Sequence, residues 1–278
     1  MGNELNCCNE SDVSKKYLKP SNDILNANNN KTEKELAKSR DFLYTSSTLK
    51  EKENSENGAI LVRDFDIGKG ALYSGLARDG KPCGPGAVVI RDSNGKVLER
   101  FEGEFENGKR NGHGVLNIAN GVEYKGEWKN DKRNGYGEET YPTGEKYKGN
   151  FVNNKKEGSG KLDLKNGDFY EGSFKNDNFE GKGCFIFKGK GVYDGEWKNN
   201  MMFGKGKFVY DDGREYVGEF KNDVKEGLGV FKWPDGRVYT GEFLNNKQHG
   251  KGEFVNKRGK LVVGRWENGV YLKKAKKT

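Results

Sequence analysis

The sequence YKGEWKNDKRNGYGEETYPTG, residues 124–144, places large aromatic side chains among glycines and charged residues. Tyr124, Gly126 and Trp128 alternate with Lys125 and Glu127, and residues two apart in a strand lie on the same face. This spacing predicts a short strand with one aromatic face and one charged face. Because glycine has no side chain, it leaves room for a neighbouring ring to lie flat against the backbone.

The same pattern recurs along most of the chain. Copies begin 23 residues apart at Phe101, Tyr124, Tyr147, Tyr170, Tyr193, Tyr216 and Tyr239. An earlier copy begins at Tyr73, after a longer interval (101 − 73 = 28), and a partial copy closes the series at Gly264–Gly269. A fixed period of this length is the sequence signature of a repeat array, in which each unit packs only on its neighbours.

The composition favours an extended array over one large core. Of 278 residues, 32% are hydrophobic and 41 are glycine, and the mean hydropathy is −1.01. The net charge is +8, and the array carries the basic excess. The chain shows neither an apolar run long enough to cross a bilayer nor a basic-then-apolar signal sequence at its beginning.

The second half of each copy predicts a second strand with the same apolar face. Phe185 and Phe187 share this face with Gly183, and the equivalent pairs are Leu116 and Ile118, Leu162 and Leu164, Phe208 and Tyr210, and Phe231 and Trp233. Between copies stand Asn120-Gly121, Asp212-Gly213 and Asp235-Gly236. Such dipeptides supply the positive φ angles of tight hairpin turns, so the residues predict an antiparallel β-meander.

Composition divides the chain into four parts. Residues 1–57 are rich in Asn, Ser and Lys and poor in apolar residues, so we expect a disordered tail. Residues 58–72 are expected to form cap strands, because a terminal repeat needs covering. The array spans residues 73–269, and residues 270–278 form a basic C-terminal tail.

The pattern Tyr-x-Gly-Glu-Trp/Phe-x-Asn followed by Gly-x-Gly resembles the MORN repeat (membrane occupation and recognition nexus) over residues 73–269, as eight copies and a partial ninth. The resemblance implies an elongated, twisted single sheet of tandem antiparallel β-hairpins. It also implies roles in scaffolding, in membrane-linked protein assembly, and in cytoskeletal or ciliary structures. Protein partners are the general expectation for the family, and some members are proposed to bind acidic phospholipids. The first copy departs from the pattern at Leu76-Ala77.

No motif predicts catalysis, a cofactor or a metal site. Gly158–Leu162 and Gly204–Phe208 resemble phosphate-binding loops but lack the Ser or Thr that must follow Gly-Lys. The recurring Glu127, Glu196, Glu219 and Glu242 are expected to form a solvated face that pairs with lysines. The four cysteines and two histidines have no metal-ligand spacing. No cysteine has a CxxC partner, and those within the array lie far apart in the sequence, so we expect a reducing compartment and no disulfide framework.

The N-terminal residues predict a lipid anchor. Met1-Gly2-Asn3-Glu4-Leu5-Asn6 exposes Gly2 for N-myristoylation, although Asn6 is a weaker choice than Ser or Thr. Adjacent Cys7 and Cys8 are placed for palmitoylation. A myristate alone holds a membrane only marginally, and a second lipid makes the anchor stable. The alternative is an ordinary tail with incidental cysteines.

Basic pairs occupy the predicted loops of copies two to four. They are Lys109 and Arg110, Lys132 and Arg133, and Lys155 and Lys156. At repeat spacing they predict a basic stripe along one edge, which would meet an anionic lipid or an acidic partner. The alternative is loop charge that only keeps the protein soluble. Nucleic acid is not an expected partner, because no reading module accompanies the basic residues.

The same loops become apolar in copies five to seven. They hold Phe179, then Met201, Met202 and Phe203, then Val224. Exposed apolar residues in register predict a protein-binding edge. The alternative is that these side chains fold back over the sheet.

Together these features predict a non-enzymatic scaffold, tethered to a cytosolic membrane surface such as the inner face of the plasma membrane. Its partners would be proteins of unidentified kind, acidic phospholipids, or a second copy of the chain. The alternative is a structural component of a cilium, basal body or cortical cytoskeleton that does not touch lipid.

Overall fold

The computed structural model describes residues 58–272, and every regular element in this part is a β-strand. One open sheet contains all nineteen strands, which confirms the predicted all-β fold. The strands are β1 Ile60–Asp66, β2 Ala71–Arg78, β3 Lys81–Arg91, β4 Val97–Glu106, β5 Lys109–Ile118, β6 Glu123–Lys129, β7 Lys132–Thr140, β8 Lys146–Val152, β9 Lys155–Asp163, β10 Phe169–Lys175, β11 Asn178–Phe187, β12 Gly191–Lys198, β13 Met201–Tyr210, β14 Glu215–Lys221, β15 Val224–Lys232, β16 Val238–Leu244, β17 Lys247–Val255, β18 Leu261–Glu267 and β19 Val270–Leu272.

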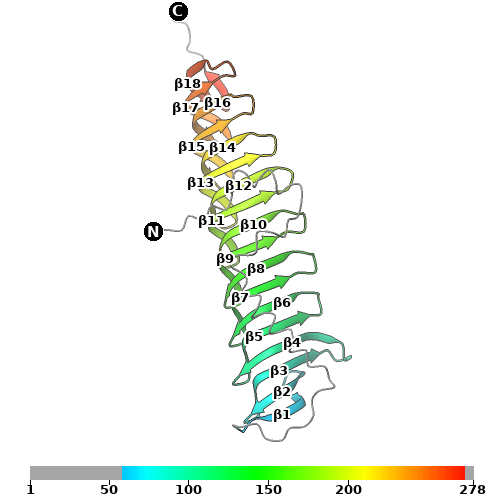
Figure 1. Cartoon of the computed structure of the whole chain (residues 1–278). Helices are drawn as coiled ribbons and strands as arrows, with labels where there is room; N and C mark the ends of the chain where they lie inside the picture. Colours follow the sequence, from blue (N-terminus) through cyan, green and yellow to red (C-terminus); the bar gives the residue numbers. More distant parts are fainter. Residues whose placement is uncertain (1–57, 273–278) are drawn as a thin grey trace, which may run out of the picture. The chain divides into compact units, whose positions relative to one another are not determined.

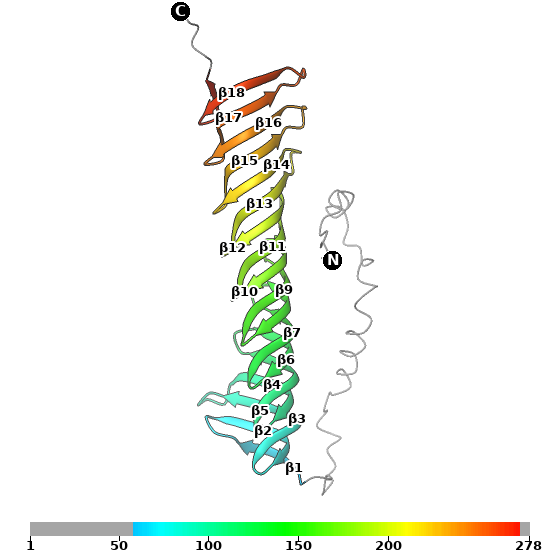
Figure 2. The same ribbon diagram turned by 90° about the vertical axis from the view of Figure 1, so that its left-hand side faces the viewer.

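The chain divides into a unit of residues 1–61 and a unit that begins at Val62 and contains the array. Within the second unit each strand from β2 onward pairs antiparallel with the next one in the sequence, as in β6–β7 and β7–β8. The strands therefore follow one another along the unit in chain order (Figure 1). The pairing of each strand with the next confirms the predicted antiparallel meander. Figure 2 shows that the sheet also twists gradually along this unit.

Glycine slots under tyrosine rings hold each hairpin together. Gly126 and Gly137 are cross-strand partners in β6 and β7, and a methyl group built on Gly137 would overlap the ring of Tyr124. The Tyr124 hydroxyl donates a hydrogen bond to the carbonyl oxygen of Glu127 at 3.0 Å. The same arrangement recurs in the later copies, where each tyrosine is fully buried. The expected packing of rings over glycines is confirmed.

A continuous ladder of rings joins the copies. The Tyr124 ring meets Trp128 of its own copy at 5.2 Å and Phe151 of the next copy at 5.2 Å, both edge-to-face. Such edge-to-face pairs contribute about 0.5–1.5 kcal/mol each beyond the area they bury. From one end to the other the ladder contains Tyr73, Phe105, Phe101, Trp128, Tyr124, Phe151, Tyr147, Phe174, Tyr170, Trp197, Tyr193, Phe220, Tyr216, Phe243, Tyr239, Trp266 and Tyr271.

The turns differ from the prediction in one respect. The tightest turns lie inside the copies, where Asn130 and Asp131 both adopt a positive φ, at 50° and 64°. Between copies, at Asn120-Gly121, only the glycine has a positive φ, and its N–H donates to the Ile118 carbonyl at 2.8 Å. Asn and Asp tolerate the left-handed region because their short side chains bond to nearby backbone. The turns predicted at Asn-Gly between copies are therefore wider than two-residue hairpin turns, and each is closed by a left-handed glycine.

The recurring glutamates do not pair with lysines as expected. The Glu127 carboxylate accepts the main-chain N–H of Tyr136 at 2.9 Å, and Glu242 accepts that of Lys251 at 3.0 Å. These carboxylates lie over left-handed glycines such as Gly135, where the paired strands change register. Glu127, Glu196 and Glu242 therefore satisfy backbone donors at the bulges of their own copies. Among the residues described, none forms a helix of the length and hydropathy that a bilayer requires.

Candidate interaction surface

A repeated position at the start of each second strand covers the ring ladder. The residues at this position are Arg110, Arg133, Lys156, Phe179, Met202, Lys225 and Gln248, and we call them the covering residues. Each is bonded to the turn of the next copy. The Arg133 N–H donates to the Asn154 side chain at 2.8 Å, and the Asn154 N–H donates back to the Arg133 carbonyl at 3.0 Å. In the first six of these residues, from Arg110 to Lys225, the side chain lies against the ring face.

The basic pairs are split by this geometry. All three pairs begin strands β5, β7 and β9 rather than lying in loops. Lys109, Lys132 and Lys155 are exposed. Their neighbours are half-buried over rings: the Arg110 guanidinium lies 4.5 Å from the Trp128 ring centre, that of Arg133 5.1 Å from Phe151, and the Lys156 ammonium 5.1 Å from Tyr147. Only one residue of each pair is therefore presented to solvent, and binding of an anionic partner stays a prediction.

A buried carboxylate interrupts the apolar face in copy three. Glu139 is 6% exposed and occupies the position that holds Leu116 and Leu162 in the neighbouring copies. Its carboxylate pairs with the Arg133 guanidinium and accepts the Tyr141 hydroxyl. Burial, followed by the hydrogen bond to Glu139, raises the pKa of Tyr141. Arg133 is therefore paired with a carboxylate of its own copy.

The apolar covering residues also pack inward. Phe179 stacks on Tyr170 with ring centres 3.8 Å apart, and Met202 packs against the aromatic cluster. Phe203 lies under the Lys198 ammonium at 5.1 Å, and Met201 and Val224, like the other three, are only partly exposed. Phe179 and Met202 thus complete the ring face, as the alternative of side chains folded back over the sheet describes. A protein-binding role of these five residues stays a prediction.

A second row of rings lies beside the ladder in the C-terminal copies, and it contains the outer residue of each aromatic pair that the sequence places on the apolar face. We call Phe187, Tyr210 and Trp233 the aromatic row; all three are partly exposed, and Asn256 holds the next equivalent position. They alternate with the buried Phe208 and Phe231, and the ring centres of Phe187 and Phe208 are 5.7 Å apart. In the N-terminal copies the equivalent positions hold Ile118, Tyr141 and Leu164.

Arginines border the aromatic row. The Arg214 guanidinium lies 4.9 Å from the Tyr210 ring centre, and that of Arg237 lies 5.0 Å from Trp233. Each is held by a turn aspartate, with Arg214 donating to Asp212 at 2.7 Å, and this hydrogen bond lowers the pKa of Asp212. The sequence signal was present, since both arginines follow an aromatic residue by four positions across a turn.

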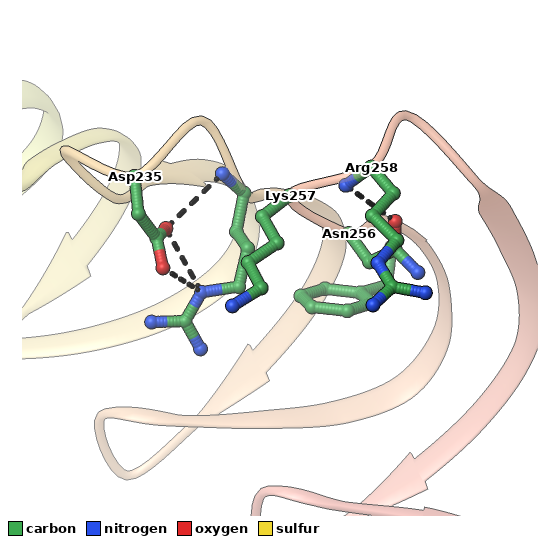
Figure 3. A pocket seen from close by; sticks show the side chains of 6 residues that line it. Asp235, Asn256, Lys257 and Arg258 are labelled. Atoms are coloured by element: carbon green, nitrogen blue, oxygen red, sulfur yellow. Dashed lines mark hydrogen bonds and ion pairs between the residues drawn. The ribbon is translucent and has the colours of Figure 1, made fainter.

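The aromatic row ends at an open hollow of about 620 Å³. Figure 3 shows Asp235 and its bound guanidinium on one turn, with Lys257, Asn256 and Arg258 on the next turn. The Phe254 ring lines the same hollow. A shallow hollow with a ring floor and cationic walls suits an acidic side chain of a partner better than an enclosed small molecule, because it removes little of a ligand from water.

Burial changes the ionisation of two covering lysines. Desolvation lowers the pKa of Lys225 to about 8, with Arg214 as a smaller cause, and burial also lowers that of Lys156. The Lys225 ammonium lies among Tyr210, Tyr216 and Phe231, at 5.1, 5.3 and 5.1 Å from the ring centres. Within residues 58–272 no group of three or more His, Cys, Asp or Glu side chains could hold a metal ion. Gly2, Cys7 and Cys8 lie outside the described residues.

Comparison with known families agrees with this geometry. The MORN repeat family model matches seven segments: residues 101–122, 124–146, 147–169, 170–192, 193–213, 216–236 and 239–259. The chain therefore belongs to the MORN repeat family, whose members are repeat proteins. No curated protein matches the chain.

Solved structures with some likeness include two domains of low identity. One is the SAS-4 (dCPAP) TCP domain of Drosophila melanogaster in complex with a proline-rich motif of Ana2, 13% identical over 56% of this chain and 85% of that chain, with a TM-score of 0.36. The other is the wild-type TCP10 domain of Danio rerio CPAP, 11% identical over 67% of this chain and 85% of that chain, with a TM-score of 0.38. At these scores neither likeness informs the function of this chain.

Proposed function

We propose that this protein is a non-catalytic MORN-repeat scaffold that is tethered to a cytosolic membrane surface and docks a protein partner on its aromatic row. The observation that carries the proposal is the row itself: Phe187, Tyr210 and Trp233 stand partly exposed, in register, on one face of a rigid sheet. Rigid aromatic side chains contribute large contact area at a low entropic cost, and they dominate protein interfaces. The bordering Arg214 and Arg237 add charge for an acidic partner.

The tether rests on the N-terminal residues and on exposed lysines. Myristate on Gly2 with palmitate on Cys7 or Cys8 supplies the two lipids that stable anchoring needs. Lys109, Lys132 and Lys155 repeat at the turn ends of successive copies, two strand spacings or about 10 Å apart. This spacing is close to one Debye length in physiological salt, so their fields reinforce one another only modestly. The lipids would anchor the chain, and the lysines would orient it.

Cell fractionation separates the tether from the docking surface. We expect Gly2→Ala, or Cys7→Ser with Cys8→Ser, to move the full chain from membranes to the soluble fraction. Tyr210→Ala with Trp233→Ala should keep the chain at membranes but remove its co-purifying proteins. Val115→Ala, on the opposite face of β5, is the matched control. If wild type and tail variants all stay with the detergent-insoluble cytoskeleton, the tether is wrong and the structural role in a cilium or cortex is favoured.

Liposome binding tests the lysines. Lys109→Ser, Lys132→Ser and Lys155→Ser together should weaken binding of the full chain to phosphatidylserine vesicles by about tenfold or more, since each lysine near such a surface contributes about 1 kcal/mol. The control is a triple change of Lys125, Lys148 and Lys161, which are equally exposed but lie at mid-strand. Equal losses from both triples would show that only net charge matters.

A further inference from the structure

The face opposite the rings changes character along the array. One residue per strand, each paired with the next across the sheet, forms what we call the back row. From β5 to β18 it contains Asn117, Glu123, Thr140, Lys146, Asp163, Phe169, Ile186, Val192, Val209, Glu215, Lys232, Val238, Val255 and Leu261. The first five are polar, as an exposed sheet face requires. From Phe169 onward all are apolar except one acid and one base.

This second half of the back row is symmetric about the line between β14 and β15. Glu215 and Lys232 face each other across that line. Beyond Glu215 stand Val209, Val192 and Ile186, and beyond Lys232 stand Val238, Val255 and Leu261. Leu261 is 53% exposed and Val192 is 7% exposed, and the other four are partly exposed. The order is therefore three apolar residues, an acid, a base, and three apolar residues.

The neighbouring residues extend the symmetry. Val217 and Val230 are partners across the same line, and Val217 is 43% exposed. Leu228, on the same face, is 62% exposed. Farther along this neighbouring row, Lys207 and Thr240 stand in symmetric positions, as do Asp194 and Glu253, so the charge symmetry is limited to the back row. Exposed apolar side chains gathered in this way on a sheet mark an interaction site.

We infer that the partner on this face is a second copy of the chain, related by a two-fold axis that runs parallel to the strands between β14 and β15. This rotation places Glu215 opposite Lys232 of the second copy and Val209 opposite Val238 of the second copy. Each contact occurs twice, because Lys232 and Val238 of the first copy likewise face Glu215 and Val209 of the second. An interface of this kind uses the same surface twice, so it must be complementary to itself. The back row meets that condition in both charge and hydropathy.

The packing follows the rules for stacked sheets. Two sheets face each other at about 10 Å and cross at about 30°, with inward side chains interdigitating. Branched valine and isoleucine side chains fill such a layer without long flexible stems. The central charges are already partly desolvated, because Glu215 binds Lys232 at 3.0 Å and Lys207 at 3.1 Å and its side chain is 23% exposed. Enclosing these ion pairs therefore removes less water than enclosing free charges would.

Sedimentation equilibrium of the full chain tests the inference. Wild type should dimerise in a concentration-dependent manner. Glu215→Lys and Lys232→Glu should each raise the dissociation constant by at least about tenfold, because like charges would then face each other twice per dimer. An equimolar mixture of the two variants should dimerise again, since each lysine pair would face a glutamate pair. Lys146→Glu, in the polar half of the back row, is the matched control and should leave the dimer unchanged.

Mixing separates the interface from an effect on folding. Each variant also breaks the ion pair within its own chain, and mixing cannot repair that pair. Recovery on mixing therefore supports the inference. A wild type that stays monomeric at all concentrations overturns it, as does a dimer that both variants retain. A dimer that is lost in the variants and not recovered on mixing also overturns it.

Discussion

At the scale of single residues, Gly137 shows what the repeat demands. The Tyr124 ring occupies the space where a Cβ would lie, and Tyr124 is itself fixed between Trp128 and Phe151. We expect Gly137→Ala to lower the free energy of unfolding by about 1–3 kcal/mol, the usual cost of overpacking. In a Tyr124→Leu background the same change should cost less, because the ring is gone. Urea unfolding measures both losses. An equal loss of unfolding free energy in the two backgrounds would contradict the packing of the Tyr124 ring over Gly137.

Lys225 gives a pH dependence at the same scale. Burial lowers its folded pKa from 10.5 to about 8, so between these values the unfolded chain binds more protons than the folded chain. The contribution of Lys225 to stability therefore rises as the pH increases from 8 towards 10.5. We expect Lys225→Met to stabilise the protein at pH 7 and to gain less at pH 9.5, as measured by urea unfolding. Lys247→Met, at an exposed site, is the control, and a gain independent of pH would contradict the prediction.

At the scale of the hairpin, the turns join the copies as much as the rings do. Asn154 adopts a φ of 72°, accepts the Arg133 N–H at 2.8 Å and donates to the Arg133 carbonyl at 3.0 Å. Asp131 does the same for Arg110 in the preceding copy. The second residue of each tight turn therefore needs both a left-handed backbone and an oxygen acceptor.

Three substitutions at Asn154 separate these needs. Asn154→Asp should be nearly neutral, because aspartate occupies the same place at residue 131. Asn154→Gly keeps the backbone but loses the acceptor and should cost about 0.5–1.5 kcal/mol. Asn154→Ala should cost about 1–2 kcal/mol more, since alanine is strained in the left-handed region. Thermal or urea unfolding gives the order, and a glycine variant less stable than the alanine variant would contradict it.

The hairpin scale also shows what the sequence predicts well. Alternation at Tyr124, Gly126 and Trp128 was sufficient to predict the strands and their inward face. The Asn-Gly and Asp-Gly dipeptides predicted the antiparallel order. The turns were harder, because Asn-Gly suits both a tight turn and a wider turn closed by glycine. The covering residues were predicted to lie in loops, because residue type alone does not show whether a side chain points toward the rings or toward solvent. Arg133 points inward only because its backbone is bonded to Asn154 of the next copy.

At the scale of the whole array, the repeat itself was predictable and its surfaces were not. The period predicted the order of strands from β2 onward. The back row appears only when the register of each pair is known, because its members stand 6 to 17 residues apart in the sequence. The rings of the aromatic row were visible in the sequence, but their partial exposure and their bordering arginines were not. The register shift at each β-bulge, as between Gly126 and Trp128, decides which residues become cross-strand neighbours. No local sequence pattern specifies that register shift.

The array should behave as a one-dimensional system, in which stability is a sum of units and their contacts. Phe151 joins copies three and four through Tyr124 and Tyr147, at 5.2 and 5.1 Å between ring centres. Phe151→Ala should weaken this junction by about 3–5 kcal/mol, the cost of removing a buried ring. The strands before β8 and those after β9 should then unfold as separate blocks.

Native-state hydrogen exchange distinguishes separate blocks from uniform weakening. In the Phe151→Ala variant, amides of β4–β7 should open at a different free energy from amides of β11–β16, whereas in the wild type the two groups should open together. Trp266→Ala is the matched control, because it removes a ring of the same ladder at its end, where Tyr239 is the last tyrosine of a complete copy. That variant should loosen only β17–β19 and leave one block. An equal loss of protection along the whole Phe151→Ala array would show cooperativity that exceeds contacts between neighbours.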